Sequence, residues 1–252
     1  TRAGHIAIWP DIYSRTHCMY MMASGGRQES NVMKLYGVSG AGGFGREVMP
    51  LAEHRAGSRD CNGEDTEVVF VVEDQFRIPD TEINGRRVIS MREFLTTPAS
   101  ERRFNIAIGN SVVRERIANA IPADLATAFS IFAPNHLSLY GNSIGEGAVF
   151  CSFTHVTSNV RIGRFFHGNI YSYVAHDCVI GDFVTFAPGV KCNGHVVIED
   201  HAYIGTGAVI RDGSREPVVI GRGAIIGMGA VVTKSVAPGV TVVGNPARPL
   251  IR

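Results

Sequence analysis

The chain has 252 residues, which is enough for one large domain or two of ordinary size. Its hydrophobic content of 45% and its formal net charge of +1 are typical of a globular protein and give no electrostatic basis for binding nucleic acid. No apolar run approaches the roughly 20 residues that span a bilayer. The five cysteines show no C-x-x-C spacing, which predicts a reducing, cytoplasmic setting.

Residues 1–32 differ in composition from the rest of the chain. They carry the single tryptophan and several methionines without any sustained period, and they end in a linker-like stretch. A signal peptide would need a compact apolar segment, which this stretch lacks. We therefore expect an extension that lies outside the fold, with the folded chain beginning near Met33.

A glycine loop follows the first apolar strand, which we expect within residues 34–39. Residues 40–45 match G-x-G-x-x-G, and a helix is expected from 46 to 54. The glycines let backbone amides approach a phosphate, and the helix N-terminus favours its negative charge. Taken alone, such a loop could serve a dinucleotide, a nucleotide sugar or no ligand.

Two further strands are predicted, each followed by residues suited to nucleotide binding. The strand at 67–72 ends in Glu73 and Asp74, whose carboxylates can accept hydrogen bonds from a ribose or a base. The strand at 104–108 ends in Gly109 and precedes a helix. Alternating strands and helices predict an α/β, Rossmann-like domain over residues 33–130. We expect a small parallel sheet, because so short a segment leaves no room for the six strands of a full dinucleotide domain.

The stretch from Ile144 to Val209 repeats every six residues. A compact apolar residue opens each hexad and a small residue follows four positions later. A period of six fits neither a helix nor a flat strand and is typical of a left-handed parallel β-helix, which we place at residues 131–252. The opening residue should point inward, and glycine at the second position should permit the turn. The period breaks at 210–219, where four extra residues should form a loop.

Histidine is the first candidate for acid–base chemistry near neutral pH. The β-helix carries five: His155, His167, His176, His195 and His201. None opens a hexad, so we expect all five to be exposed. His176 stands apart because the adjacent Asp177 can fix its tautomer. Cys178 is the rival nucleophile, and its hexad position should turn it inward.

Two other functions fit parts of the pattern. Some hexapeptide-repeat proteins bind zinc through three histidines and act as carbonic anhydrases. Here His195 and His201 are six residues apart and have no evident distant third ligand, so we expect no metal. A β-helix could also serve as a non-catalytic scaffold, which would not bind acetyl-CoA.

The glycine loop, the short Rossmann-like part and the hexad repeat together resemble the sugar acetyltransferases grouped with the sialic acid O-acetyltransferases. The pattern is most similar to bacterial N-acetyltransferases of UDP-4-amino sugars, as in the bacillosamine pathway, and to perosamine N-acetyltransferases. The resemblance implies acetyl-CoA-dependent N-acetylation of a UDP- or GDP-4-amino-4,6-dideoxy sugar by a homotrimer. O-acetylation of sialic acid or a related polysaccharide sugar is the alternative.

The resemblance also implies roles for individual residues. His176, in His-Asp-Cys-Val-Ile-Gly, would be the general base in a direct transfer, and Asp177 would orient it. The nucleotide sugar would contact Ser39, Gly40, Ala41, Glu73, Asp74 and Gly109. Acetyl-CoA would lie between neighbouring β-helices and contact Thr185, Gly194, Thr206 and Met228. Many relatives have histidine in place of Ala41, and some have a second histidine in place of Thr185.

Overall fold

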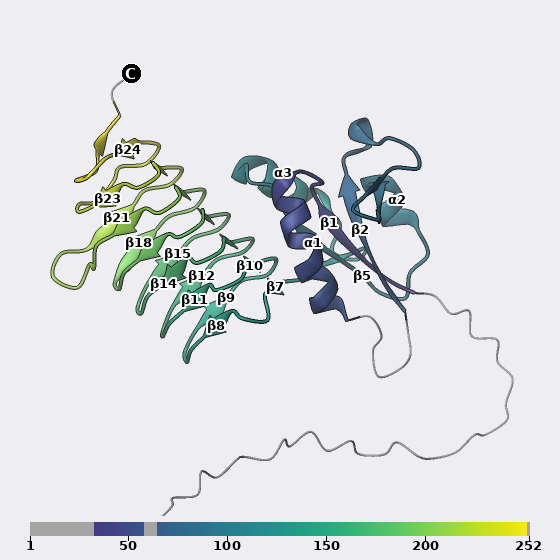
Figure 1. Cartoon of the computed structure of the whole chain (residues 1–252), viewed down its shortest axis with the longest axis horizontal. Helices are drawn as coiled ribbons and strands as arrows, with labels where there is room; N and C mark the ends of the chain where they lie inside the picture. Colours follow the sequence, from purple (N-terminus) through teal and green to yellow (C-terminus); the bar gives the residue numbers. More distant parts are fainter. Residues whose placement is uncertain (1–32, 58–64, 251–252) are drawn as a thin grey trace, which may run out of the picture. The chain divides into compact units, whose positions relative to one another are not determined.

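The computed structural model of the protein describes residues 33–57 and 65–250, which belong to one compact unit. The expectation for residues 1–32 lies outside this described part of the chain. An α/β part comes first and a stack of short parallel strands follows (Figure 1). None of the described helices is long and apolar enough to cross a membrane.

The α/β part is built on a six-stranded sheet in the order β3-β4-β2-β1-β5-β6. The strands are β1 (Lys34–Ser39), β2 (Thr66–Val72), β3 (Glu82–Ile83), β4 (Arg86–Ser90), β5 (Arg102–Ile106) and β6 (Thr127–Ala128). β1 lies between β2 and β5 and is parallel to both, whereas β3 runs antiparallel to β4. The sheet has six strands, but β3 and β6 are only two residues long and β3 is antiparallel, so it is smaller than the full dinucleotide domain for which the sequence predicted no room. The four longer strands form the small parallel core that the sequence predicted.

The helices of this part are α1 (Gly43–Ala56), the 3₁₀ helix η1 (Asp74–Phe76), α2 (Met91–Thr96) and α3 (Ser111–Ala120). α2 was not predicted, although its capping box is visible in the sequence: Ser90 Oγ accepts from the Glu93 amide, and Glu93 Oε2 accepts from the Ser90 amide. The side chain of Asn110 caps α3 by accepting from the amides of Val112 and Val113. The capped N-termini of α2 and α3 therefore lie at the carboxyl edge of the sheet, after β4 and β5 respectively.

The remaining strands coil into a left-handed parallel β-helix with three sheets, which confirms the predicted fold class. The first sheet contains β7 (Ile131–Phe132), β10 (Val149–Phe150), β13 (His167–Gly168), β16 (Thr185–Phe186), β19 (Tyr203–Ile204), β22 (Ile225–Ile226), β24 (Thr241–Val243) and the antiparallel β25 (Arg248–Pro249). The second contains β8 (Leu137–Ser138), β11 (His155–Val156), β14 (Tyr173–Val174), β17 (Lys191–Cys192), β20 (Val209–Ile210) and β23 (Val231–Val232). The third contains β9 (Ser143–Ile144), β12 (Arg161–Ile162), β15 (Val179–Ile180), β18 (Val196–Ile198) and β21 (Val218–Ile220).

One coil of the β-helix takes three hexads. Val149 pairs with His167, and His167 pairs in turn with Thr185, so residues eighteen positions apart stack on each other. The hexad-opening residues and the small residues fill the interior as predicted, and those of the central coils, such as Ile180, Ile198 and Ala202, are almost fully buried. Burying this apolar surface is the main force that holds the coils together.

The corners of the β-helix differ from the expectation for glycine. Backbone in the left-handed region occurs at the fourth position of the hexad, where Phe165, Asp177 and His195 adopt φ of 52°, 58° and 57°. The second-position glycines serve another purpose: a Cβ on Gly145 would lie 2.7 Å from the Arg164 amide nitrogen of the next coil. These glycines therefore allow close stacking of coils, while the turn itself is made two residues later.

Aromatic side chains join the two parts of the compact unit. Phe165 and Phe183 occupy the same corner of successive coils and stack with their ring centroids 5.6 Å apart. Both belong to one buried cluster with Phe104 and Ile106 of the N-terminal sheet part. The predicted loop lies between β20 and β21 at residues 211–217 and leaves the stacking of those strands on β17 and β18 intact.

Candidate active site

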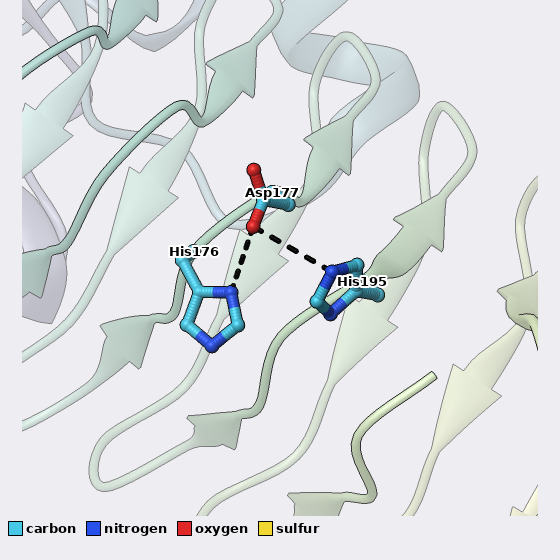
Figure 2. Close-up of side chains that lie close together, drawn as sticks. All are labelled: His176, Asp177 and His195. Carbon is cyan, nitrogen blue, oxygen red and sulfur yellow. Dashed lines mark hydrogen bonds and ion pairs between the residues drawn. The ribbon is translucent and has the colours of Figure 1, made fainter. Parts of the chain in front are cut away.

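His176 and Asp177 lie at a corner of the β-helix, directly after β14. The side chain of Asp177 turns back toward its neighbour, and His176 Nδ1 lies 2.8 Å from Asp177 Oδ2 (Figure 2). The left-handed backbone of Asp177 produces this turn, and Asp is among the residues that tolerate it best. Both side chains are about half exposed, so the free edge of the imidazole is accessible to a substrate.

A second histidine reaches the same carboxylate from the next coil. His195 Nε2 lies 3.6 Å from Asp177 Oδ2 (Figure 2), and the rings of His195 and His176 meet edge to face with centroids 5.0 Å apart. His195 Nδ1 lies 3.5 Å from Asp212 Oδ2. Asp212 stands at the start of the loop after β20, so that loop contributes a carboxylate to this corner. We call His176, Asp177, His195 and Asp212 the histidine corner.

The carboxylates of the histidine corner are anionic at neutral pH. The hydrogen bond from His176 holds the pKa of Asp177 below its ordinary value. Hydrogen bonds from the hydroxyl and amide of Ser214 lower the pKa of Asp212 to about 2. An ionised carboxylate can only accept, so Nδ1 of His176 carries the proton and Nε2 of the neutral ring keeps a free lone pair. This is the tautomer that a general base requires.

Gly194 and Cys178 border the histidine corner. A Cβ on Gly194 would lie 2.6 Å from His176 Cε1 and 2.9 Å from Asp212 Oδ2, so only glycine lets this coil pass so close to the imidazole. The Cys178 side chain is fully buried, as predicted, and its Sγ lies 3.1 Å from the Asn193 carbonyl oxygen. A buried thiol that faces the interior is not placed to attack a substrate at the surface.

Among the described residues, one group of side chains could hold a metal ion, and it coincides with the histidine corner. One ligand atom each from His176, Asp177 and His195 lies within 4.8 Å of the others, and imidazole and carboxylate are zinc ligands. The pair considered from the sequence, His195 and His201, is separated: His201 stacks on Phe183 at another corner and lies 3.4 Å from Glu115 Oε2.

The glycine loop borders a cavity of about 330 Å³, which we call the loop cleft. Its lining comprises Ser39, Gly40, Ala41, Gly42, Val71, Val72, Glu73, Phe76, Ile108, Val113 and Ile117. Gly40 has a φ of 106°, and a Cβ on Gly45 would collide with the Gly40 carbonyl oxygen, so both positions require glycine. Gly42 and Gly43 face open space at the N-terminus of α1, which has no side-chain cap. Their amides can therefore bind a phosphate.

The two acidic residues after β2 already have partners. Glu73 binds Arg116 of α3 with both carboxylate oxygens, at 2.8 and 2.9 Å, and this interaction lowers the pKa of Glu73. Asp74 Oδ1 accepts a hydrogen bond from the Arg92 amide at the start of α2, 3.1 Å away. Glu73 lines the loop cleft, whereas Asp74 lies outside it. The structure thus brings Glu73, but not Asp74, to the glycine loop.

A second cavity, of about 340 Å³, lies between the start of α1 and the β-helix; we call it the inter-part cavity. It brings together Gly109, Thr185 and Thr206, three residues singled out from the sequence. Thr185 is nevertheless buried, and its hydroxyl accepts a hydrogen bond from Arg114. Met228 is 82% exposed and lies one coil beyond Thr206, whose carbonyl accepts from Gly229. Gly194 lies at a different corner from both Thr206 and Met228.

Sequence reasoning missed three features of these sites. His167 was expected to be exposed, but it is fully buried against the N-terminal part, with Nε2 2.8 Å from the Ile106 carbonyl oxygen and Nδ1 3.1 Å from Arg114. The pairing of His195 with Asp177 could have been found, because the two residues are eighteen positions, or one coil, apart. Asp212 lies in the inserted loop, where the hexad count gives no register.

The chain is similar to known proteins over most of its described length. The family described as the PglD N-terminal domain matches residues 37–121. GDP-perosamine N-acetyltransferase of Escherichia coli O157:H7 is 50% identical over 221 residues, which are 87% of this chain and 98% of that protein. WeeI from Acinetobacter baumannii AYE is 52% identical, with a TM-score of 0.79 over 86% of this chain and all of that one. The acetyltransferase domain of PglB from Neisseria gonorrhoeae FA1090, solved with acetyl coenzyme A, is 31% identical with a TM-score of 0.73, over 86% of this chain and all of that one.

Proposed function

The chain belongs to the hexapeptide-repeat sugar N-acetyltransferases, and on that premise we propose that it acetylates the amine of a GDP-linked 4-amino-4,6-dideoxy sugar with His176 as general base. Acetyl-CoA is the co-substrate of this acyltransferase. GDP is favoured over UDP because the relative that is 50% identical over nearly its whole length is named for GDP-perosamine. The His176–Asp177 contact of 2.8 Å at an accessible corner is the observation that carries the chemical assignment.

The transfer follows from the tautomer of His176. The sugar amine attacks the thioester carbonyl carbon in its neutral form, RNH2. As the C–N bond forms, the nitrogen loses one proton to His176 Nε2. Collapse of the tetrahedral intermediate breaks the C–S bond, and the imidazolium returns the proton to the leaving thiolate. Asp177 stabilises the imidazolium while it exists. The products are the N-acetyl sugar and coenzyme A, and no acetyl-enzyme is formed.

The oxyanion of the tetrahedral intermediate needs a hydrogen-bond donor close to the base. Gly194 is our candidate, because its backbone passes within van der Waals contact of the His176 ring. A rigid backbone amide stabilises developing negative charge without reorganisation, which is why such donors are effective in acyl transfer. Asp212 also lies close to this glycine, since a Cβ on Gly194 would be 2.9 Å from Asp212 Oδ2.

The nucleotide of the substrate fits the loop cleft. The uncapped amide of Gly42 borders the cleft and can bind the diphosphate together with the amide of Gly43, which lines the inter-part cavity. The cleft is otherwise lined mostly by apolar residues that can pack against a base. Ser39, Gly40, Ala41 and Glu73 line the same cleft, and Gly109 lines the adjoining inter-part cavity. In this account Asp74 acts through α2 rather than by contact with the nucleotide, because its carboxylate already receives the Arg92 amide.

The acetyl-CoA residues suggest that neighbouring copies complete the site. Gly194 follows a strand of the second sheet, whereas Thr206 and Met228 follow strands of the first sheet, so the two sets lie at different corners of one β-helix. A coenzyme between two β-helices could contact one corner of each. Exposed apolar residues such as Tyr140, Phe153 and Tyr171, the last two stacked 5.1 Å apart, suit such an interface. We therefore propose a homotrimer, which light scattering on the purified protein tests directly.

A thiol-release assay with acetyl-CoA tests the proposed function. The acceptors are GDP- and UDP-linked 4-amino-4,6-dideoxy sugars, CMP-sialic acid and free sialic acid, each assayed with and without EDTA. We expect turnover on the GDP-linked amine that EDTA does not change. Turnover on sialic acid alone would replace N-acetylation by O-acetylation, and loss of activity in EDTA would replace the metal-free mechanism.

A further inference from the structure

Arg114 is the largest fully buried side chain of the described residues, and its charge has no counter-ion there. It projects from α3 with 0% exposure, and no carboxylate in residues 33–57 or 65–250 forms an ion pair with it. Burial lowers its pKa to about 9, which still leaves it a cation at neutral pH. A buried charge without a partner of opposite sign costs several kcal/mol, so Arg114 needs a reason beyond packing.

The guanidinium of Arg114 instead binds neutral acceptors from both parts of the protein. On the sheet side, Nη1 donates to the Ile108 carbonyl oxygen at 2.8 Å and approaches the Gly109 carbonyl oxygen at 3.4 Å. On the β-helix side, Nη2 donates to the Phe183 carbonyl oxygen and to Thr185 Oγ1, the latter at 3.0 Å. The planar fork of arginine can hold both sides at once, which a lysine cannot do.

His167 completes this arrangement. Its Nδ1 lies 3.1 Å from Arg114 Nη1 and its Nε2 lies 2.8 Å from the Ile106 carbonyl oxygen. Because arginine only donates, Nδ1 must accept and Nε2 must donate, so the ring is neutral with a fixed tautomer. His167 of β13 therefore binds the end of β5 directly through Nε2 and binds the Arg114 guanidinium through Nδ1.

The residues that Arg114 holds border both cavities. Ile108 lines the loop cleft, and Gly109 lines the inter-part cavity. Thr185 and His167 line the inter-part cavity from the β-helix side. The segment of Ile108 and Gly109 therefore separates the two cavities, and Arg114 fixes that segment relative to the β-helix. Attachment of the two parts alone would not need this cation, since the aromatic cluster around Phe165 and Phe183 already joins them.

We propose that Arg114 is a positioning residue that sets the sugar end of the substrate in the inter-part cavity relative to the nucleotide bound in the loop cleft. This role rests on the proposed function, because it assumes that one nucleotide-sugar molecule spans both cavities. Arg114 does not contact the reacting atoms. It acts through the carbonyl groups of Ile108 and Gly109 and through Thr185.

The kinetic test compares Arg114→Lys with Arg55→Lys, an exposed arginine in the last turn of α1. A misplaced substrate reacts slowly without losing its anchor, so kcat/KM for the nucleotide sugar should fall about 10²-fold in Arg114→Lys. The affinities for GDP and for acetyl-CoA should stay within about twofold of wild type. An unchanged kcat/KM overturns the role of Arg114, and so does a GDP affinity that falls by the same factor.

A milder variant covers the case in which Arg114→Lys does not fold. Thr185→Val removes one of the hydrogen-bond acceptors of the Arg114 guanidinium and keeps the shape of the side chain. It should lower kcat/KM in the same direction with acetyl-CoA affinity retained, and adding it to Arg114→Lys should cause little further loss, because both act through one contact. Wild-type kinetics in Thr185→Val, or fully additive losses in the double variant, overturn the role.

Hydrogen exchange separates this role from the proposed reaction, because it needs no turnover. With GDP or UDP alone, wild-type protein should show slower amide exchange at residues 106–109 and also at residues 183–185. Arg114→Lys should keep the first protection and lose the second. Protection of both segments in the variant overturns the role of Arg114, whereas failure of every acceptor in the wild-type assay would refute the proposed function alone.

Discussion

Gly194 passes so close to His176 that a single added methyl group would have to displace the imidazole: a Cβ would lie 2.6 Å from Cε1 and 2.9 Å from Nε2. The Cε1–Nε2 side of the His176 ring thus lies against the backbone of Gly194, with no side chain between them. Gly194 lies outside the left-handed region, so alanine would be allowed there apart from this contact. The relationship ties the choice of glycine to catalysis rather than to the fold.

Gly194→Ala should therefore lower the rate more than the stability. We expect kcat to fall about 10²-fold, because the ring that accepts the proton must shift by a sizeable fraction of an ångström. The thermal unfolding midpoint should change little. Steady-state kinetics and circular dichroism measure the two effects.

Gly145→Ala is the matched comparison. A Cβ at Gly145 would lie within 3 Å of backbone atoms of Gly163 and Arg164, which cannot move aside, so this variant should lose stability. A loss of stability in Gly194→Ala equal to that in Gly145→Ala, with kcat preserved, would contradict the assignment of Gly194 to the site.

Asp177→Asn isolates the charge of the orienting residue. Asparagine also tolerates the left-handed backbone at this position, so the corner should keep its shape. The amide can donate to Nδ1 and so favour the wrong tautomer of His176, and kcat should fall by roughly 10²–10⁴-fold. A fall in kcat with normal acetyl-CoA binding and normal unfolding would support this role, and wild-type kcat would exclude it.

His195→Gln tests how far the histidine corner extends. His195 contacts Asp177 at 3.6 Å, a longer distance than the 2.8 Å from His176, so its loss should cost less. We expect kcat to fall about tenfold, which corresponds to about 1.4 kcal/mol. The pH–rate profile is the informative measurement, since a purely structural role would leave its acidic limb unmoved.

The sequence predicted the parts of the structure that repeat. The six-residue period specified the β-helix, its interior and the inward position of Cys178, because a periodic pattern has one structural solution. The contact between the side chains of His176 and Asp177 could be predicted because the two residues are neighbours in sequence and lie at one rigid corner. The glycine loop likewise formed where strand, turn and helix were expected.

The remaining parts depend on contacts that have no local signal. His167 occupies an outward hexad position like that of His155, but the N-terminal part covers it, so its burial could not be inferred from the repeat. Arg114 lies within a predicted helix, and nothing in its neighbourhood distinguishes it from the exposed Arg116. Asp212 follows a break in the period, where the stacking register is lost. These residues link elements that are distant in sequence.

The buried His167 and the partly buried His136 make stability depend on pH. Burial lowers the pKa of His167 well below its ordinary value, and burial also lowers that of His136 to about 4. In the unfolded chain both titrate near 6.5, so between about pH 6.5 and pH 4 the unfolded state binds more protons. The free energy of unfolding should therefore fall as the pH drops through this window.

Urea unfolding at several pH values measures this dependence. His136→Gln removes one of the two groups and should reduce the slope of unfolding free energy against pH while leaving the kinetics at neutral pH unchanged. A profile that stays flat from about pH 6.5 to about pH 4 would contradict the neutral state of these two histidines in the folded protein.

The most direct test of the account is the rate of thiol release by His176→Asn with a GDP-linked 4-amino sugar, measured beside calorimetric binding of acetyl-CoA. If His176 is the general base, the variant should bind the coenzyme as wild type does and release thiol about 10²–10⁴-fold more slowly. Turnover near the wild-type rate would show that another group accepts the proton and would overturn the assignment of the histidine corner.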